Sequence, residues 1–119
     1  MTGSDPALPG LGAAPAIAAV LTRTGHAAGE LAAIELVEAF AAQSIAVLSR
    51  VGLRDDDPRV CADGGALALG HPWGASGAVA VVRLFARLVR AGAADGTIGL
   101  AAASVGGGLG VAAVFEVVR

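Results

Sequence analysis

The chain has 119 residues, of which 55% are hydrophobic and only 15% charged. This composition fits one folded domain and excludes a disordered charged segment. All 8 basic residues are arginine, which excludes Walker-type phosphate loops, Schiff-base chemistry and pyridoxal-phosphate enzymes, because all of these need a lysine amine. The net charge of -2 and a sequence pI near 5.5 argue against nucleic acid as a main partner.

A single cysteine, Cys61, rules out an internal disulfide and fits a reducing compartment. The opening MTGSDPALPG lacks the basic segment of a signal peptide, so we expect none. We also expect no membrane span, because no run of about 18 apolar residues is free of charges and helix breakers. These features predict a small cytoplasmic domain.

The first half of the chain predicts two helices around one strand. Residues 1–12 are rich in Pro, Gly and Ser and are expected to form an irregular entry segment. A helix is expected over Ala16–Arg23 and a short buried strand over Leu31–Val37, whose apolar character only Glu35 breaks. A second helix is expected from Glu38 to a closing Gly52.

The second half predicts a solvated turn, a long helix and a closing hairpin. Arg54–Arg59 is the most polar stretch, and Val60–Ala62 is expected to be a brief strand. Pro72 opens a helix that ends at Gly92. Two β-like runs, Thr97–Ser104 and Val111–Val118, then flank a glycine turn.

This order of elements predicts an α/β domain over residues 13–119, preceded by the irregular segment 1–12. Its sheet is expected to be mixed and mostly parallel, with a final antiparallel hairpin. The long helix has an apolar face and an opposite arginine stripe, which we predict to be its solvated side. The apolar face is Val79, Val82, Phe85, Ala86 and Val89, and the stripe is Arg83, Arg87 and Arg90.

His71 is the first candidate for chemistry, because it precedes Pro72 where the long helix is expected to begin. A neutral imidazole there can accept a proton or donate a hydrogen bond near pH 7. The alternative is a purely structural histidine that caps the helix. Small residues around it allow a ligand or another backbone to approach closely. They are Gly64, Gly65, Gly70, Gly74, Ala75, Ser76 and Gly77.

The second candidate is the glycine turn of SVGGGLG, Ser104–Gly110. Consecutive glycines expose N–H groups that can hold an oxyanion or a phosphate, and a plain hairpin turn is the alternative. A match to G-x-G-x-x-A ends at Ala113, but too little chain follows it for a dinucleotide-binding unit. A zinc site on Cys61, Asp63 and His71 would lack a fourth ligand.

Three segments, in this order, resemble the C-terminal half of thiolases. They are VEAFAAQ (Val37–Gln43), GGALALGHPWGASG (Gly64–Gly77) and SVGGGLGVA (Ser104–Ala112), and the likeness runs from about Pro9 to the end. The resemblance implies an acyltransferase that cleaves 3-ketoacyl-CoA with coenzyme A, or condenses two acyl-CoA molecules. It also implies a chain of two similar α/β halves packed in five layers, in dimers or tetramers.

The family pattern also implies roles for residues of this chain. His71 matches the histidine that activates the nucleophilic cysteine and helps to hold the thioester oxygen. Ser104 stands where the family has its second catalytic cysteine, beside the glycine turn. The residues implied to line the substrate are Gly70, Gly74, Ser76, Gly106, Gly107 and Gly108.

Several positions depart from the family pattern. The nucleophile belongs to the N-terminal half, and Cys61 is not its equivalent. Ser104 is a poor replacement for an acid/base cysteine, because a hydroxyl is far less acidic than a thiol. Val37 replaces the asparagine that orients a water in an oxyanion hole and is expected to be non-functional. The strand before the first helix is expected to be missing, because residues 1–12 look irregular.

The leading hypothesis is therefore a thiolase-type C-terminal half that needs a separate N-terminal half carrying the nucleophilic cysteine. The alternative is a catalytically dead structural or regulatory subunit, and a third reading is a small acyl-CoA or anion binder. The expected partners are a thiolase N-terminal half or further copies of the chain, with an acyl-CoA thioester as substrate. No metal and no further cofactor are expected.

Overall fold

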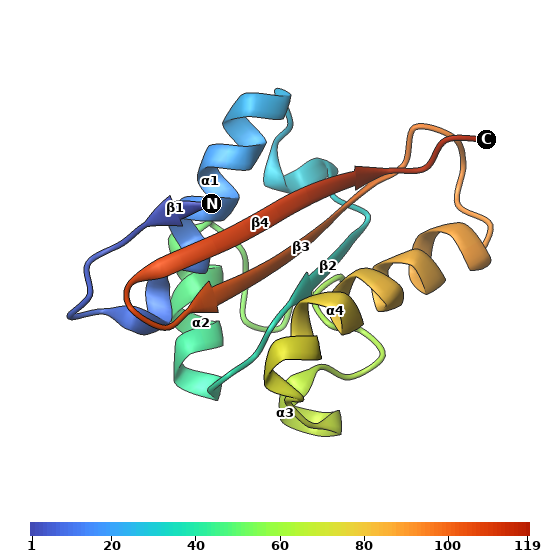
Figure 1. The fold of residues 1–119 in the computed structure, drawn as a ribbon. Helices are drawn as coiled ribbons and strands as arrows, with labels where there is room; N and C mark the ends of the chain where they lie inside the picture. Colours follow the sequence, from blue (N-terminus) through green and yellow to red (C-terminus); the bar gives the residue numbers. More distant parts are fainter.

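In the computed structural model, which describes residues 1–119, helices cover both faces of a four-stranded sheet (Figure 1). The strands are β1 (Thr2–Gly3), β2 (Ala33–Leu36), β3 (Ile98–Val105) and β4 (Leu109–Glu116). The helices are α1 (Ala13–Thr24), α2 (Ala41–Arg50), α3 (Ala66–Leu69) and α4 (Ser76–Phe85), which continues as the π-helical turn η4 (Ala86–Arg90). Short 3-10 turns are η1 (Pro9–Leu11), η2 (Ala28–Glu30) and η3 (Trp73–Ala75). No helix is both long and apolar enough to cross a membrane.

The sheet has the strand order β1-β4-β3-β2 and is mixed, which confirms the α/β class and the final hairpin. It is not mostly parallel, however, because only β2 and β3 pair in parallel, whereas β4 pairs antiparallel with both β3 and β1. The strand predicted over Val60–Ala62 is reduced to one bridge between Val60 and Ile34, since Cys61 turns to a φ of 44°. The prediction that residues 1–12 hold no strand is also wrong: Thr2 and Gly3 pair with the end of the hairpin, a contact too short to leave a pattern.

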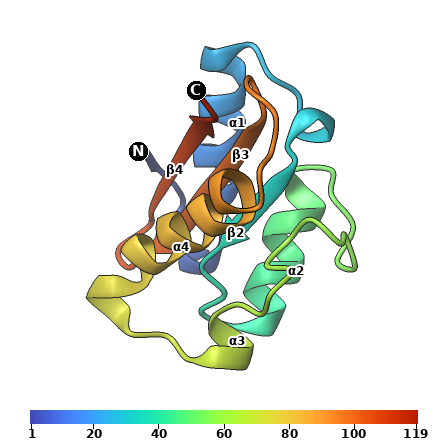
Figure 2. The ribbon, with the colours of Figure 1, turned by 90° about the vertical axis from the view of Figure 1, so that its right-hand side faces the viewer.

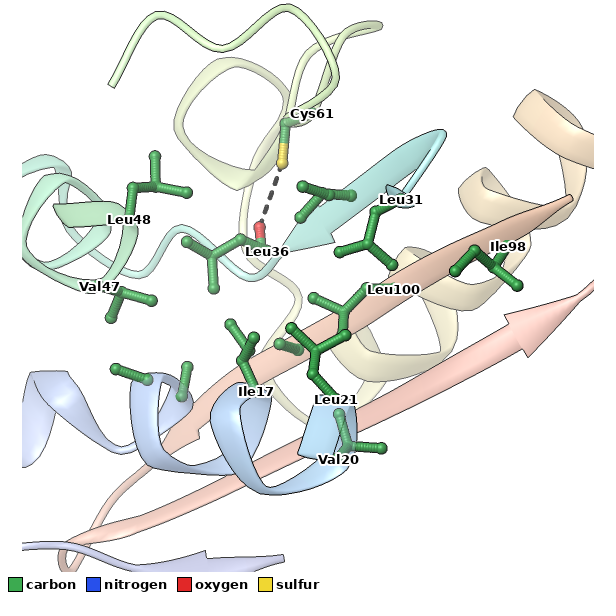
Figure 3. Close-up of a cluster of buried hydrophobic side chains, with 14 residues drawn as sticks. Ile17, Val20, Leu21, Leu31, Leu36, Val47, Leu48, Cys61, Ile98 and Leu100 are labelled. Carbon is green, nitrogen blue, oxygen red and sulfur yellow. Dashed lines mark hydrogen bonds between the residues drawn. The ribbon is translucent and has the colours of Figure 1, made fainter. Parts of the chain in front are cut away.

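The larger core lies between the sheet and the layer formed by α1 and α2 (Figure 3). Alternate residues of β2 and β3, such as Ile34, Leu36 and Leu100, point to this side, as the two-residue repeat of a strand requires. Ile17 of α1 and Val47 of α2 belong to the same buried cluster. In all, 14 buried residues form this cluster, so this face of the sheet is closed by the chain itself.

The opposite face of the sheet is covered by α4, and its core is smaller, with 7 buried residues (Figure 2). Glu35 of β2 points into this side and is only 2% exposed. Arg87 lies 2.7 Å and Arg83 3.4 Å from its carboxylate oxygens. The prediction of a solvated arginine stripe is thus wrong for these two arginines, because a buried carboxylate needs counter-charges.

The outward side of α4 carries an apolar patch instead. We call this the α4 patch; it consists of Val79, Val82, Phe85 and Val89, all of them exposed. Val82 is 67% and Phe85 51% exposed. Ala80, Leu84 and Leu88 are the side chains with which the helix packs on the sheet. The predicted apolar face is therefore real, but it is turned away from the domain's own core.

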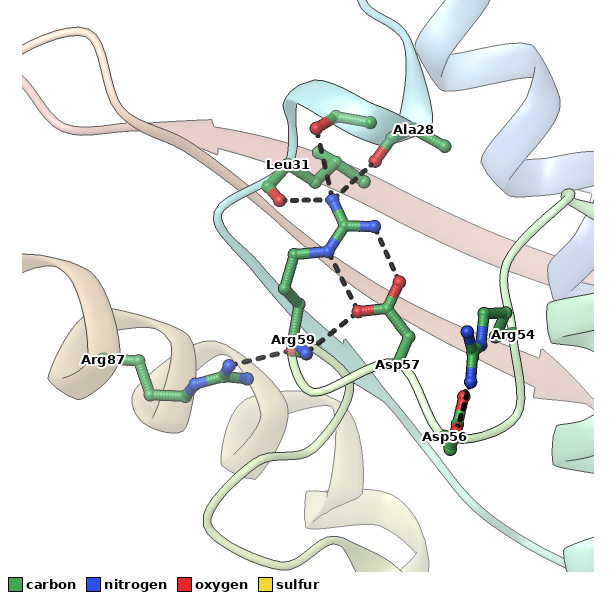
Figure 4. A network of polar contacts seen from close by, with 8 residues as sticks. Ala28, Leu31, Arg54, Asp56, Asp57, Arg59 and Arg87 are labelled. Carbon is green, nitrogen blue, oxygen red and sulfur yellow. Dashed lines mark hydrogen bonds and ion pairs between the residues drawn. The ribbon is translucent and has the colours of Figure 1, made fainter.

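The polar segment Arg54–Arg59 is only partly the solvated turn that its composition predicts (Figure 4). Arg54 pairs with Asp56 on the surface, whereas Asp57 and Arg59 are half-buried and bonded to one another. The Arg59 guanidinium lowers the pKa of the Asp57 carboxyl to about 2 by hydrogen bonding. Arg59 also donates to the carbonyl oxygens of Ala28, Gly29 and Leu31. The turn is thereby fastened to η2, before strand β2.

Candidate active site

The candidate residues gather at one edge of the domain, where the parallel strands β2 and β3 end. Val37 follows β2 directly, and Ser104 lies near the end of β3. The segment between α3 and α4, which holds His71, passes along this end of the fold (Figure 2). The carboxyl edge of parallel strands is a common place for ligands in α/β proteins.

His71 is held by the first residue of α4. Its Nδ1 atom lies 2.6 Å from the hydroxyl oxygen of Ser76, whose side chain is buried. Its Nε2 atom makes no hydrogen bond within the chain, which leaves this nitrogen for a substrate or a partner. The helix begins at Ser76 and not at Pro72 as predicted, because the chain first makes the turn η3 with Trp73 at a φ of 41°. This turn is what folds His71 back onto the helix.

Glu38 anchors the glycine-rich loop that leads to His71. Its carboxylate accepts a hydrogen bond from the N–H of Leu67 at 3.3 Å. A Cβ atom on Gly65 would collide with this carboxylate, so a larger residue there would displace the end of the Glu38 side chain. The sequence places Glu38 at the start of the second helix, but α2 begins three residues later, at Ala41, and Glu38 serves the loop instead. Its position two residues after the buried strand β2 is the signal that could have revealed this.

Val37 offers no polar atom to the site beyond its backbone. Its N–H donates to the carbonyl of Ala102 at 2.8 Å and so extends the pairing of β2 with β3. Its side chain is 8% exposed and lines a cavity of about 40 Å³, together with Gly70, Pro72 and Ser76 of the histidine loop. A buried isopropyl group can orient neither water nor a thioester oxygen.

Ser104 is fully engaged with its own chain. Its hydroxyl donates to the carbonyl of Gly10 at 2.7 Å. The same oxygen accepts from the N–H of Ala13 at 3.0 Å and from the amide of Gln43 at 3.4 Å. No hydrogen bond links Ser104 to His71, so the two candidates belong to separate networks at the same edge. The hydroxyl at this position acts as a tether between the hairpin and the start of α1.

The glycines of the turn differ in their surroundings: two face open space and one contacts the N-terminal segment. Nothing lies within 4 Å of a Cβ placed on Gly106 or Gly107. Gly108 is different, because such a Cβ would lie 2.8 Å from the carbonyl oxygen of Ser4. Only the first two glycines therefore present free backbone to a ligand.

Cys61 is buried in the larger core and has no features of a reactive thiol. Burial raises its pKa to about 11, and its Sγ lies 3.3 Å from the carbonyl oxygen of Leu36. The zinc site considered on Cys61, Asp63 and His71 does not form, because no group of three His, Cys, Asp or Glu side chains comes together anywhere in the chain.

Comparisons with known proteins agree with this architecture. Residues 1–117 match the family described as the C-terminal domain of thiolase. The chain is 45% identical over 114 residues to a beta-ketoadipyl-CoA thiolase of Pseudomonas knackmussii, which covers 96% of this chain and 28% of the relative. The chain therefore spans less than a third of the length of this relative.

Two solved structures show the same fold. Human mitochondrial 3-ketoacyl-CoA thiolase, in complex with CoA, superposes with a TM-score of 0.89 at 35% identity, over 99% of this chain and 29% of that one. Peroxisomal 3-ketoacyl-CoA thiolase of Saccharomyces cerevisiae gives a TM-score of 0.85 at 37% identity, over 96% and 31%. It is a five-layered α-β-α-β-α structure built from two core domains of identical topology. The chain belongs to the thiolase C-terminal domain family.

Proposed function

We propose that the chain is the C-terminal half of a thiolase-type acyltransferase and acts on acyl-CoA or 3-ketoacyl-CoA thioesters without a further cofactor. The observation that carries this proposal is His71, which Ser76 holds with its Nε2 free at the edge of the sheet. In the proposed reaction, Nε2 accepts the proton of a nucleophilic cysteine that the N-terminal half supplies. Gly70, Gly74, Gly106 and Gly107 would line the substrate, because small residues let a thioester approach the backbone. Gly108, which faces Ser4, is left out of this set.

We propose that the N-terminal half docks on the α4 patch. Two domains of three layers each give five layers only if they share one helical layer, as in the yeast relative. The layer of this chain that fits is α4, since its outward side carries Val82 and Phe85, both more than half exposed. Exposed apolar surface of this kind marks a protein interface. The helices α1 and α2 would then form an outer layer.

A second candidate is a catalytically inactive subunit that keeps the fold. Two observations favour it. The Ser104 hydroxyl already donates to the carbonyl of Gly10 and is a poor acid or base. Val37 puts a buried apolar group where the family has an asparagine. On this reading the chain still docks with a partner, but it adds no acid/base group beyond His71.

Association tests the docking step. The chain is co-expressed with a thiolase N-terminal half, and the complex is measured by size-exclusion chromatography. We expect Val82→Asp to abolish the complex, because it places a charge in an apolar interface. Ile45→Asp is the matched control, since Ile45 is 51% exposed on α2 and belongs to the outer layer. A complex that survives Val82→Asp, or one that Ile45→Asp abolishes, contradicts docking on the α4 patch.

Activity of that complex separates the two candidates. 3-Ketoacyl-CoA thiolysis is measured for the wild type, for His71→Ala and for the double variant Val37→Asn, Ser104→Cys. Wild-type turnover that His71→Ala removes supports the acyltransferase. Turnover seen only in the double variant supports the inactive subunit. If neither form turns over while the complex assembles, the acyltransferase proposal is wrong.

A further inference from the structure

The ion cluster beneath α4 leaves one guanidinium without hydrogen bonds. Glu35 accepts a hydrogen bond from Arg87 at 2.7 Å, whereas the Nε atom of Arg83 lies 3.4 Å from its second carboxylate oxygen, in an ion pair without a hydrogen bond. The Nε and Nη2 atoms of Arg83 are buried and have no hydrogen-bond partner. Two arginines thus share one carboxylate, and the cluster keeps one net positive charge. Buried donors of a charged group are costly when they stay unpaired.

A cavity lies beside this guanidinium. It has a volume of about 40 Å³ and is bounded by Glu35, Val37, Arg83 and the loop residues Gly70 and Pro72. A site of 10–15 Å³ already holds one water, so about 40 Å³ accommodates a few waters or one carboxylate group. A carboxylate matches a guanidinium in both charge and geometry, whereas water only matches its donors.

We propose that this cavity is a binding site for a single carboxylate group, which Arg83 receives through its Nη2 atom, while its Nε atom stays with Glu35. The group would complete the cluster as two arginines with two carboxylates and remove its net charge. Val79 of the α4 patch also lines the cavity. The carboxylate belongs either to a free small ion or to the end of a longer molecule.

Thermal unfolding of the full 119-residue chain in sodium formate tests the site. A ligand that binds only the folded state raises Tm in proportion to the logarithm of its concentration. We expect a rise of about 3 °C or more at concentrations well above Kd. Valerate, with a short alkyl chain behind its carboxylate, separates the two sources: a stronger effect than formate indicates the end of a longer molecule, and a weaker one a free ion.

Two variants keep the test specific to Arg83. Arg83→Met removes the guanidinium but retains the Glu35–Arg87 pair, and it is expected to abolish the dependence of Tm on formate. Arg90→Met, an exposed residue of the same helix, makes the same change of charge and is expected to leave the dependence intact. A second readout is the ¹⁵N–¹H signal of the Arg83 Nε group, which should shift and saturate with formate. An equal formate effect in wild type and Arg83→Met, or an unmoved Arg83 signal, overturns the proposal.

Discussion

The two faces of the sheet are covered by helices in different ways. On the α1/α2 side, 14 buried residues close a purely apolar core. On the α4 side only 7 residues are buried, a carboxylate and two arginines lie among them, and the outward residues of the helix are themselves apolar. The same sheet is therefore covered on one face by a layer of two helices and on the other by a helix that carries apolar side chains on both its inner and its outer side.

This difference supports the proposal that a partner docks on the α4 side of the domain. A helix that only covers a sheet needs one apolar stripe, with polar residues facing water. α4 packs on the sheet through Ala80, Leu84 and Leu88 and still exposes Val82 and Phe85. The excess of apolar residues in the composition is thus explained by two uses, a core and an exposed patch.

The largest effect is expected when a substitution creates a cavity in the core between the sheet and the α1/α2 layer, which we call the closed face. Leu100 is 0% exposed between α1 and β2, and Leu100→Ala is predicted to cost about 3 kcal/mol of unfolding free energy in urea denaturation. Val82→Ala on the α4 patch is the contrasting variant and is expected to cost less than about 0.5 kcal/mol in the isolated chain. A large loss for Val82→Ala would show that the α4 patch is buried in the free chain and would break the comparison.

The second effect tests the polar core of the α4 side. Arg87→Met removes the closer partner of Glu35 and the hydrogen bonds to the carbonyls of Ile34 and Arg59. We expect a loss of about 2.5 kcal/mol at neutral pH, below the usual 3–5 kcal/mol for a broken buried pair, because Arg83 remains near the carboxylate. A cost equal to that of exposed Arg90→Met would contradict the buried cluster.

The sequence predicts the elements well because their patterns are local. The first helix, the buried strand, the second helix and the closing hairpin all follow from periodicity, glycines and prolines, although their observed bounds differ by a few residues from the predicted ones. The orientation of α4 does not follow, since both of its sides carry apolar residues and the choice depends on Glu35 across the layer. A lone acidic residue in an apolar strand was the available signal.

In the candidate site, too, local patterns predict which residues matter, but not the contacts that the tertiary fold gives them. The motif around His71 identifies the residue, but its bond to Ser76 depends on the turn at Trp73, where a non-glycine residue takes a positive φ that no pattern predicts. The network of Ser104 joins residues 94 positions apart, and such a contact is set by the tertiary fold alone. The role of Ser104 as a tether was therefore beyond reach of the sequence.

The third effect concerns this tether, which belongs to the closed face. Ser104→Ala leaves the Ala13 N–H without its acceptor and the Gly10 carbonyl without its donor. We predict a loss of about 1.5 kcal/mol, with faster hydrogen exchange in residues 10–13. Ser49→Ala, at an exposed position of α2, is the matched control and should change stability by less than about 0.5 kcal/mol. Equal losses for the two variants would mean that the tether adds nothing.

The smallest effect uses Cys61 to report on the closed face. Its pKa is raised from 9.0 to about 11 by burial, so between these values the unfolded chain loses the thiol proton while the folded chain keeps it. The unfolding free energy should therefore fall as the pH rises from 9 to 11. The chain has no Tyr and all 8 of its basic residues are arginine, so no other side chain titrates in this window. Urea denaturation under reducing conditions measures the fall, and Cys61→Ala should remove it. If the two curves stay parallel from pH 9 to 11, the thiol is accessible to water and the α1/α2 face is less tightly closed than its apolar core indicates.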